Sequence, residues 1–233
     1  MKVKKTVCLI LSVILCLLTS AVCAEQTQEP APILFRNVPW GSNMPDTYAI
    51  LEGFTFSSPN QDYAGDVDDN VLEDGEIRFK DYVSAKVYAR SLKDVKVAGY
   101  ELSGLNLHFA YTTDESGLLP KDEEHTALVF ASYTINPKDL EFVMNDLVGK
   151  LTKTYGEPSG HRTTGRSITY DIYYWLGGEG TIVSLVGESY SSGSTNVYIR
   201  YSFYGADDLY QKAIDALVYE EMLKTDTEDT SGL

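Results

Sequence analysis

The segment from Asn136 to Pro158 constrains the fold most, because it is the one stretch in which every helix signal agrees. Asn136 can cap the free backbone N–H groups of a first turn, and Pro137 fits the first helical position. Gly156 can adopt the left-handed conformation that ends a helix, and Pro158 prevents the helix from continuing. Apolar residues recur with a period of about 3.6 at Leu140, Val143, Met144, Leu147, Leu151 and Tyr155. The segment predicts one amphipathic helix lying across a sheet.

Strand-like sequence flanks this helix on both sides. Alternating or apolar stretches with Gly- and Ser-rich turn signals between them predict four strands before the helix and three after it. These expected strands cover residues 82–89, 95–102, 105–111 and 126–135, then 167–176, 181–190 and 195–204. Each set favours an antiparallel sheet, because its turns are short.

Two further helices complete the predicted fold. Ser42 can cap a short helix that ends near Gly53, and Asp207 or Asp208 can begin a last helix that extends to about Leu223. The order helix, strands, helix, strands, helix predicts an α+β protein of two tandem units, each a helix followed by an antiparallel sheet of about three to four strands, plus a C-terminal helix. The units cover residues 33–135 and 136–224.

The start of the chain is typical of a secretory signal peptide. Three lysines precede an apolar run, and Val22 and Ala24 fit cleavage before Glu25. We therefore expect a secreted or cell-envelope protein with a signal at 1–24 and a flexible lead-in at 25–32. A lipoprotein at Cys23 and an uncleaved membrane anchor are the alternatives. Because Cys8, Cys16 and Cys23 all precede the cut, the mature chain would contain no cysteine, disulfide or cysteine metal site.

The charge of the chain excludes some partners. The formal net charge is −15, and removing the signal with its three lysines leaves 16 basic and 34 acidic residues. Nucleic acid is excluded as a partner, because phosphate binding requires clustered Lys and Arg, and no membrane insertion is expected after cleavage. Residues 61–76 form an acidic insertion in which Asp66, Asp68 and Asn70 have calcium-loop spacing, but Val71 replaces the required Gly. A solvated insertion is the favoured interpretation, and residues 225–233 are expected to be a disordered acidic tail.

Two resemblances extend these expectations. The string Phe-Arg-x-x-Pro-Trp-Gly-Ser at residues 35–42, with Tyr-Gly-Glu-Pro at 155–158, resembles uncharacterised secreted proteins of Gram-positive gut-type bacteria. This similarity implies a compartment and a fold, and no reaction. The order of elements resembles the tandem helix-on-sheet units of the beta-lactamase inhibitor protein and of the small outer-membrane-assembly lipoproteins. That similarity implies a layout and no binding residue.

No catalytic motif is present in the sequence. There is no nucleophile elbow, no His-Glu-x-x-His and no phosphate-binding Gly loop. His108, His125 and His161 are far apart in sequence, so neither a metal site nor a cofactor is expected. We therefore predict a non-enzymatic protein. Paired carboxylates of a small extracellular hydrolase acting on sugar or peptide are the alternative, and a purely structural envelope protein is a third hypothesis.

The second set of strands contains the candidate binding residues. If Ile168, Tyr170, Ile172 and Tyr174 face the helix, then Asp171, Tyr173 and Trp175 face away from it. From the last strand, Tyr198, Arg200, Ser202 and Tyr204 can join this face. Tyr and Trp provide large rigid contact areas with a polar group, which suits protein interfaces and sugar stacking. The alternative is that this face packs inside the protein.

Arg36 and Trp40 allow two interpretations. They could line a cleft where the N-terminal segment crosses between the two units, or Trp40 could close an edge of the core while Arg36 pairs with a carboxylate. Together the candidate binding residues are Tyr173, Trp175, Tyr198, Arg200, Tyr204, Arg36 and Trp40. The predicted function is binding of a protein or cell-envelope component through an aromatic sheet face. The sequence predicts neither the partner nor the oligomeric state.

Overall fold

The fold was analysed in a computed structural model, which describes residues 30–60, 84–213, 215–216 and 219. The described residues from Ala31 onward belong to one compact unit. The predictions for the signal peptide, the acidic insertion with its calcium-like spacing, and the acidic tail lie outside the described residues.

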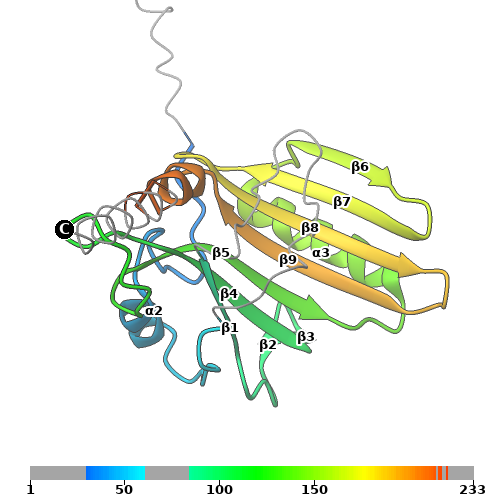
Figure 1. The fold of residues 1–233 in the computed structure, drawn as a ribbon. Helices are drawn as coiled ribbons and strands as arrows, with labels where there is room; N and C mark the ends of the chain where they lie inside the picture. Colours follow the sequence, from blue (N-terminus) through cyan, green and yellow to red (C-terminus); the bar gives the residue numbers. More distant parts are fainter. Residues whose placement is uncertain (1–29, 61–83, 214, 217–218, 220–233) are drawn as a thin grey trace, which may run out of the picture. The chain divides into compact units, whose positions relative to one another are not determined.

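One large antiparallel sheet organises the fold, in the strand order β1-β4-β5-β9-β8-β7-β6 (Figure 1). Its strands are β1 (Ser84–Tyr88), β4 (Gly104–Tyr111), β5 (Thr126–Ile135), β6 (Gly160–Thr164), β7 (Ile168–Leu176), β8 (Thr181–Tyr190) and β9 (Thr195–Phe203). A separate two-stranded hairpin consists of β2 (Lys96–Val97) and β3 (Tyr100–Glu101). The described helices are α2 (Met44–Ile50), α3 (Leu140–Tyr155) and a C-terminal helix that includes residues 206–213.

The α+β class and the antiparallel pairing are confirmed, but the structure has one large sheet where the sequence predicted two. The last strands of the two predicted units, β5 and β9, pair directly, with Phe130 opposite Ser202 and Ile135 opposite Val197. Both strands are apolar on the helix side, so each would expose an apolar edge if it ended its own sheet. Pairing them removes two exposed edges and joins the two apolar surfaces into one core.

The central helix forms as predicted, with a later start. Its N-cap is Asp139, whose carboxylate accepts a hydrogen bond from the Phe142 N–H at 3.0 Å, whereas the Asn136 side chain accepts one from the Ser103 hydroxyl. Gly156 ends the helix with a φ of 86°. The buried side chains are those of the predicted apolar stripe, Val143, Met144, Leu147 and Leu151. The fold therefore uses the predicted face of this helix.

Two other local predictions needed correction. The helix α2 is capped by Asn43, whose side chain accepts the Asp46 N–H, while the Ser42 hydroxyl donates to the Pro39 carbonyl. The predicted strand at 95–102 is the short hairpin of β2 and β3, because Ala98 and Gly99 adopt positive φ values of 52° and 91° and reverse the chain. Sequence inspection also missed the edge strand β6, whose composition is polar.

The helices share one face of the sheet. Residues of α2, α3 and the C-terminal helix belong to one buried hydrophobic cluster with alternate residues of the strands, such as Trp175, Leu185 and Ile199. In Figure 1, α3 crosses behind β7, β8 and β9, so the opposite face of these strands points toward the viewer. Among the described residues, no helix packs on that opposite face.

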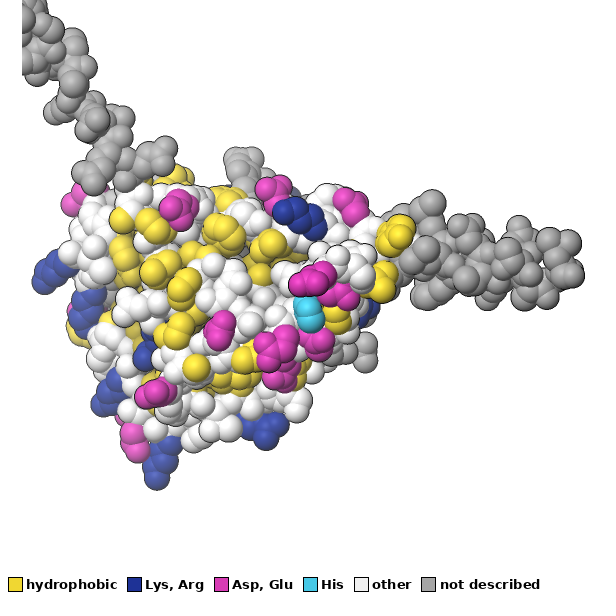
Figure 2. Space-filling view, turned by 90° about the vertical axis from the view of Figure 1, so that its left-hand side faces the viewer, with side chains coloured by type: hydrophobic (Ala, Val, Ile, Leu, Met, Phe, Trp, Pro, Cys, Tyr) yellow, Lys and Arg dark blue, Asp and Glu magenta, His cyan; other side chains and the backbone are white. Residues whose placement is uncertain are grey.

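The end of the molecule that carries α2 is chemically mixed. Figure 2 shows acidic and hydrophobic side chains interspersed across this side, with most Lys and Arg toward its margins. One of the ion pairs in the described residues joins His125 Nδ1 to Asp122 Oδ1 at 2.8 Å, and both side chains are partly exposed.

None of the helices in the described part of the chain is both long and apolar enough to cross a membrane.

Candidate functional site

Strand register assigns the predicted binding residues to two different faces of the sheet. Directly opposed residues in neighbouring strands share a face. Ile172 of β7 lies opposite Val186 of β8, which lies opposite Tyr198 of β9. Tyr174 is likewise connected through Ser184 to Arg200. Tyr198 and Arg200 therefore lie with the even-numbered residues of β7, and not with Tyr173 and Trp175 as the sequence predicted.

Trp175 belongs to the core beside α3. Its side chain is 1% exposed, and its indole N–H donates to the Gly156 carbonyl at the end of the helix, with an Nε1–O distance of 2.9 Å. This hydrogen bond satisfies a carbonyl that a helix terminus leaves without an intrahelical partner. The predicted outward position of Trp175 is therefore wrong, because the indole fills the space where the last turn of α3 meets the sheet.

Tyr173 is also on the helix side, where it lies opposite His161 of the edge strand β6. It packs against the main core and stacks on the His161 ring, with centroids 4.0 Å apart. His161 Nε2 lies 2.6 Å from Asp171 Oδ1, and the Thr163 hydroxyl donates to the same carboxylate oxygen. These four residues form a small polar cluster between β6 and β7, separate from Tyr198 and Arg200.

The opposite face contains a second hydrophobic cluster. Ile172, Ile182 and Val186 are buried there. Four half-buried tyrosines surround them: Tyr170, Tyr174, Tyr198 and Tyr204. We call the side of the sheet that these seven residues occupy the tyrosine face. Three of the predicted binding residues, Tyr198, Arg200 and Tyr204, lie on this face, whereas the sequence had assigned Tyr170 and Tyr174 to the helix side.

A buried carboxylate organises one end of the tyrosine face. Glu188 is 4% exposed, and its Oε2 atom accepts hydrogen bonds from the hydroxyls of Tyr190 and Tyr198 and from the Asn196 side chain at 2.9–3.1 Å. Burial and the Glu188 charge raise the pKa of the Tyr198 hydroxyl, which therefore remains a donor. The contacts hold the Tyr198 ring in place between Glu188 and Arg200.

Arg200 lies on β9, the fourth of the seven strands from either edge of the sheet. Its side chain is 5% exposed, and its guanidinium lies 4.6 Å from the centroid of the Tyr198 ring. No hydrogen bond or ion pair connects the Arg200 side chain to any residue that the structure describes. Buried charges in proteins are usually paired with an opposite charge, so Arg200 departs from the general pattern.

The positive charge of Arg200 contributes to a lowered pKa of His108. Its side chain is 4% exposed, and burial lowers the His108 pKa well below 6.5, with the charges of Lys86 and Arg200 lowering it further. His108 is therefore neutral in the folded protein, whereas in the unfolded chain it binds a proton as the pH falls through 6.5.

Stability is accordingly expected to fall as the pH drops below 6.5, because the unfolded state then binds a proton that folded His108 does not. One such proton contributes a slope of at most about 1.4 kcal/mol per pH unit. Urea unfolding of native and His108→Gln protein between pH 7.5 and 5 measures how the free energy of unfolding changes with pH. The variant should lose the part of this pH dependence that His108 contributes, whatever its stability at neutral pH. Parallel pH profiles for the two proteins would contradict this assignment.

Arg36 contacts aromatic rings rather than a carboxylate. Its Nε–H donates to the Tyr133 hydroxyl, and its guanidinium lies 5.0 Å from the Phe54 ring centroid and 5.5 Å from that of Tyr133. Arg36 and Asn37 have φ values of 48° and 63°, so they form a tight turn between Phe35 and Val38. The suggested pairing of Arg36 with a carboxylate is not found among its described contacts.

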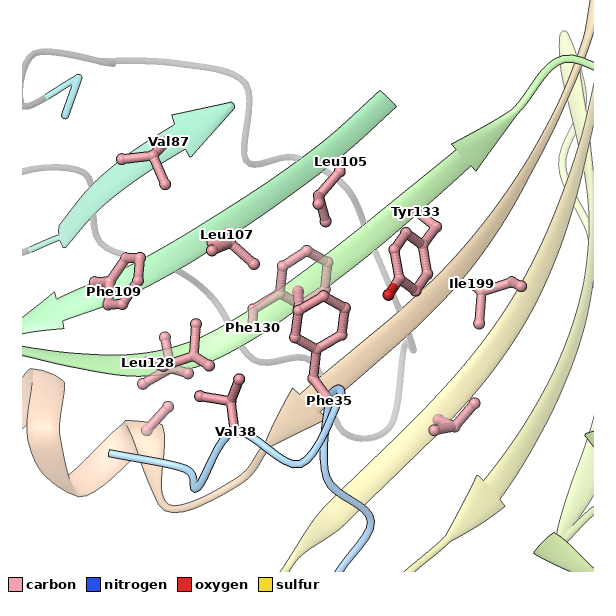
Figure 3. Close-up of a cluster of buried hydrophobic side chains, with 14 of the residues drawn as sticks. Phe35, Val38, Val87, Leu105, Leu107, Phe109, Leu128, Phe130, Tyr133 and Ile199 are labelled. Carbon is pink, nitrogen blue, oxygen red and sulfur yellow. The ribbon is translucent and has the colours of Figure 1, made fainter. Parts of the chain in front are cut away.

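The turn at Arg36 directs its flanking residues into the core. The Val38 N–H donates to the Phe35 carbonyl at 2.9 Å, and both side chains are fully buried. Figure 3 shows Phe35 among side chains of β4 and β5, beside Tyr133 and Leu128. The string that carries Arg36 is therefore a structural part of the core.

Trp40 closes the same region from the other side. Its indole N–H donates to the Ile33 carbonyl at 2.8 Å, and its ring stacks on Phe203 with centroids 5.9 Å apart. The half-buried ring packs against the main core. These contacts agree with the structural interpretation of Trp40 as closing a core edge, and they account for its conformation without a ligand.

Neither a metal centre nor an acidic catalytic pair stands out in the described part of the chain. No group of three or more His, Cys, Asp and Glu side chains there is placed to hold a metal ion. Three carboxyls that are at least partly exposed, Asp114, Asp122 and Asp146, have lowered pKa values because of hydrogen bonds from Ser116, His125 and Lys150 respectively. A carboxyl that acts as a catalytic acid near neutral pH requires a raised pKa.

The chain was compared with protein-family models, curated proteins and solved structures, and none of the three comparisons found a match.

Proposed function

We propose that this chain is a secreted binding protein that recognises a partner protein of the cell envelope or its surroundings through the tyrosine face. One observation carries the proposal: the described helices cover one side of the sheet, while the other side bears a second hydrophobic cluster framed by four tyrosines. Tyrosines of this kind provide rigid apolar area and a hydroxyl for hydrogen bonding, which favours protein recognition.

The composition of the tyrosine face supports a recognition role over a purely structural one. It combines buried aliphatic residues with Arg200 and Glu188, two buried charges that are expensive to place inside a protein. On the helix side, by contrast, no Asp, Glu, Lys or Arg side chain that the structure describes is buried, and the main buried cluster packs against the helices. A sheet face needed only for stability would be expected to resemble the helix side.

The order of elements supports a finer hypothesis on the layout. Each half of the chain runs from a helix to a set of antiparallel strands, and the last strand of each half, β5 or β9, pairs with the other. We propose that the two halves are related units that share one sheet. The signal-like N-terminus supports secretion, and cleavage before Glu25 would be checked by mass determination of the exported chain.

The test of function is capture of partners from cell-envelope and culture-supernatant extracts by immobilised protein covering residues 25–233. Tyr174 and Tyr173 are adjacent on β7 and both half-buried, but they lie on opposite faces. A Tyr174→Ala, Tyr204→Ala variant is expected to reduce capture of a specific partner at least about tenfold, since aromatic hot-spot residues of an interface contribute about 2 kcal/mol or more.

Tyr173→Ala provides the matched control, because it removes the same type of side chain from the helix side of the same strand. It should retain the partner. Circular dichroism of both variants would confirm that they are folded. A partner lost with Tyr173→Ala and kept by the tyrosine-face variant would place the binding surface elsewhere, and capture of no specific partner would contradict the proposed function.

A further inference from the structure

The strongest unexplained feature of the tyrosine face is the positive charge of Arg200. The side chain is 5% exposed, and its guanidinium lies over the Tyr198 ring. A ring face compensates only part of the desolvation of a guanidinium, since such contacts contribute about 0.5–2 kcal/mol. The chain has 34 acidic residues, yet no described carboxylate is paired with this cation.

The buried carboxylate on the same face does not neutralise Arg200. Glu188 is four residues from Ser184 along β8, and Ser184 lies directly opposite Arg200. At about 3.3 Å per residue, this separation is about 13 Å along the strand. Tyr198 lies between the two charges and donates its hydroxyl to Glu188. The arrangement fixes the ring beneath the guanidinium, and no acceptor among the described residues binds the guanidinium N–H groups.

A second buried polar group lies beside Arg200. Ser184 is 1% exposed, and its hydroxyl has no hydrogen-bond partner among the described residues. On the other side Arg200 lies opposite Ser132 of β5, which lies opposite Asn106 of β4. The Asn106 side-chain oxygen is also buried without a partner in the described part of the chain. Buried polar groups without partners are rare in native proteins, and two of them lie in the row of residues that contains Arg200.

We propose that Arg200 and Ser184 bind a carboxylate side chain, Asp or Glu, presented by a peptide segment of the partner protein. This inference rests on the proposed function. A planar guanidinium suits a carboxylate, which it can bind through two parallel hydrogen bonds, and the Ser184 hydroxyl provides a further donor. The half-buried ring of Tyr174 continues this row on β7, Tyr198 lies beside the row on β9, and both supply apolar contacts for the rest of the segment.

The chemistry favours a single carboxylate over a polyanion. The chain as a whole carries a net charge of −15, which repels highly charged anions at long range. One bound carboxylate would neutralise Arg200 and satisfy the Ser184 hydroxyl at the same time.

The test uses the acetylated, amidated peptide Gly-Ser-Glu-Ser-Gly, its Glu→Gln counterpart and sodium sulfate as three separate probes of residues 25–233. Side-chain Nε–H resonances of arginine would be followed by NMR, with the Arg200 signal assigned by its loss in Arg200→Gln. The Glu peptide is expected to shift the Arg200 resonance with saturation, and the Gln peptide should bind at least about tenfold more weakly. Arg166→Gln, which changes an exposed arginine, should leave the titration unchanged.

Saturating shifts with sulfate at lower concentration than with the Glu peptide would assign the site to an inorganic anion and overturn the proposal. Equal binding of the Glu and Gln peptides, or no shift with any probe, would also overturn it. Arg200→Met separates a binding role from a structural one. Its melting temperature should be no lower than that of the native protein, because it removes a buried charge without a described ionic partner.

The two proposals can fail separately. A partner captured by native protein and equally by Arg200→Met would leave the binding function intact and exclude Arg200 as the carboxylate site. Specific binding of the Glu peptide without any captured partner protein would support the site and contradict the proposed function.

Discussion

Replacing Trp175 by alanine is expected to destabilise the protein by about 3–5 kcal/mol, the usual cost of removing a buried large aromatic side chain. Trp175 is 1% exposed, and its indole lies where the end of α3 meets β7. The substitution would leave a cavity and would also remove the hydrogen bond to the Gly156 carbonyl. Urea unfolding at neutral pH, followed by circular dichroism, measures the loss.

Two further variants separate the causes of this effect. Trp175→Phe keeps most of the apolar contact but leaves the Gly156 carbonyl without its donor, so it should cost less, about 1–3 kcal/mol. Tyr174→Ala changes the next residue on the strand, which is half-buried on the tyrosine face, and should cost less than Trp175→Ala. Equal losses for Trp175→Ala and Tyr174→Ala would contradict the assignment of these two residues to a core face and a recognition face.

Trp175 and Tyr174 also show what the sequence alone does not determine. In β7 both alternating sets contain aromatic residues, Tyr170 and Tyr174 in one and Tyr173 and Trp175 in the other. A strand has two faces and a period of two, so the direction of one set determines the other, but the alternation does not say which set is inside. The choice depends on α3, whose end provides the carbonyl that Trp175 contacts.

The elements that were predicted correctly are determined by residues within their own segments. In α3 the apolar period, the terminal Gly156 and the following Pro158 all lie within the segment itself. The N-terminal boundary was less certain, because Asn136 and Asp139 are both capable caps only three residues apart. The strands β5 and β8 have the bounds that their apolar runs predicted.

The features that were missed depend on contacts between distant parts of the chain. The pairing of β5 with β9 joins the two sets of strands, and the sequence of neither strand identifies the strand with which it pairs. β6 is polar because it is an edge strand, so hydrophobic patterning could not detect it. The sequence did identify Arg200 as a candidate. Its burial and its lack of a described ionic partner follow from the central place of β9, which only the structure shows.

Replacing Phe35 by alanine is expected to cost about 3–5 kcal/mol, which would show that the string at residues 35–42 serves the fold rather than a binding site. Phe35 is fully buried, and its ring lies 5.3 Å from the Tyr133 ring centroid and 5.5 Å from that of Tyr201. These contacts connect the N-terminal segment to the two strands, β5 and β9, that join the halves of the sheet.

The neighbouring residue Leu34 supplies the control, because its side chain is 36% exposed. Leu34→Ala should change stability by less than about 1 kcal/mol, as substitutions of exposed residues generally do. Both variants would be compared by urea unfolding. If Phe35→Ala were as stable as Leu34→Ala, the N-terminal segment would not be part of the core. A large loss confined to Phe35→Ala would mean that this string stabilises the core that β5 and β9 share, and hence supports the sheet on whose other side the tyrosine face lies.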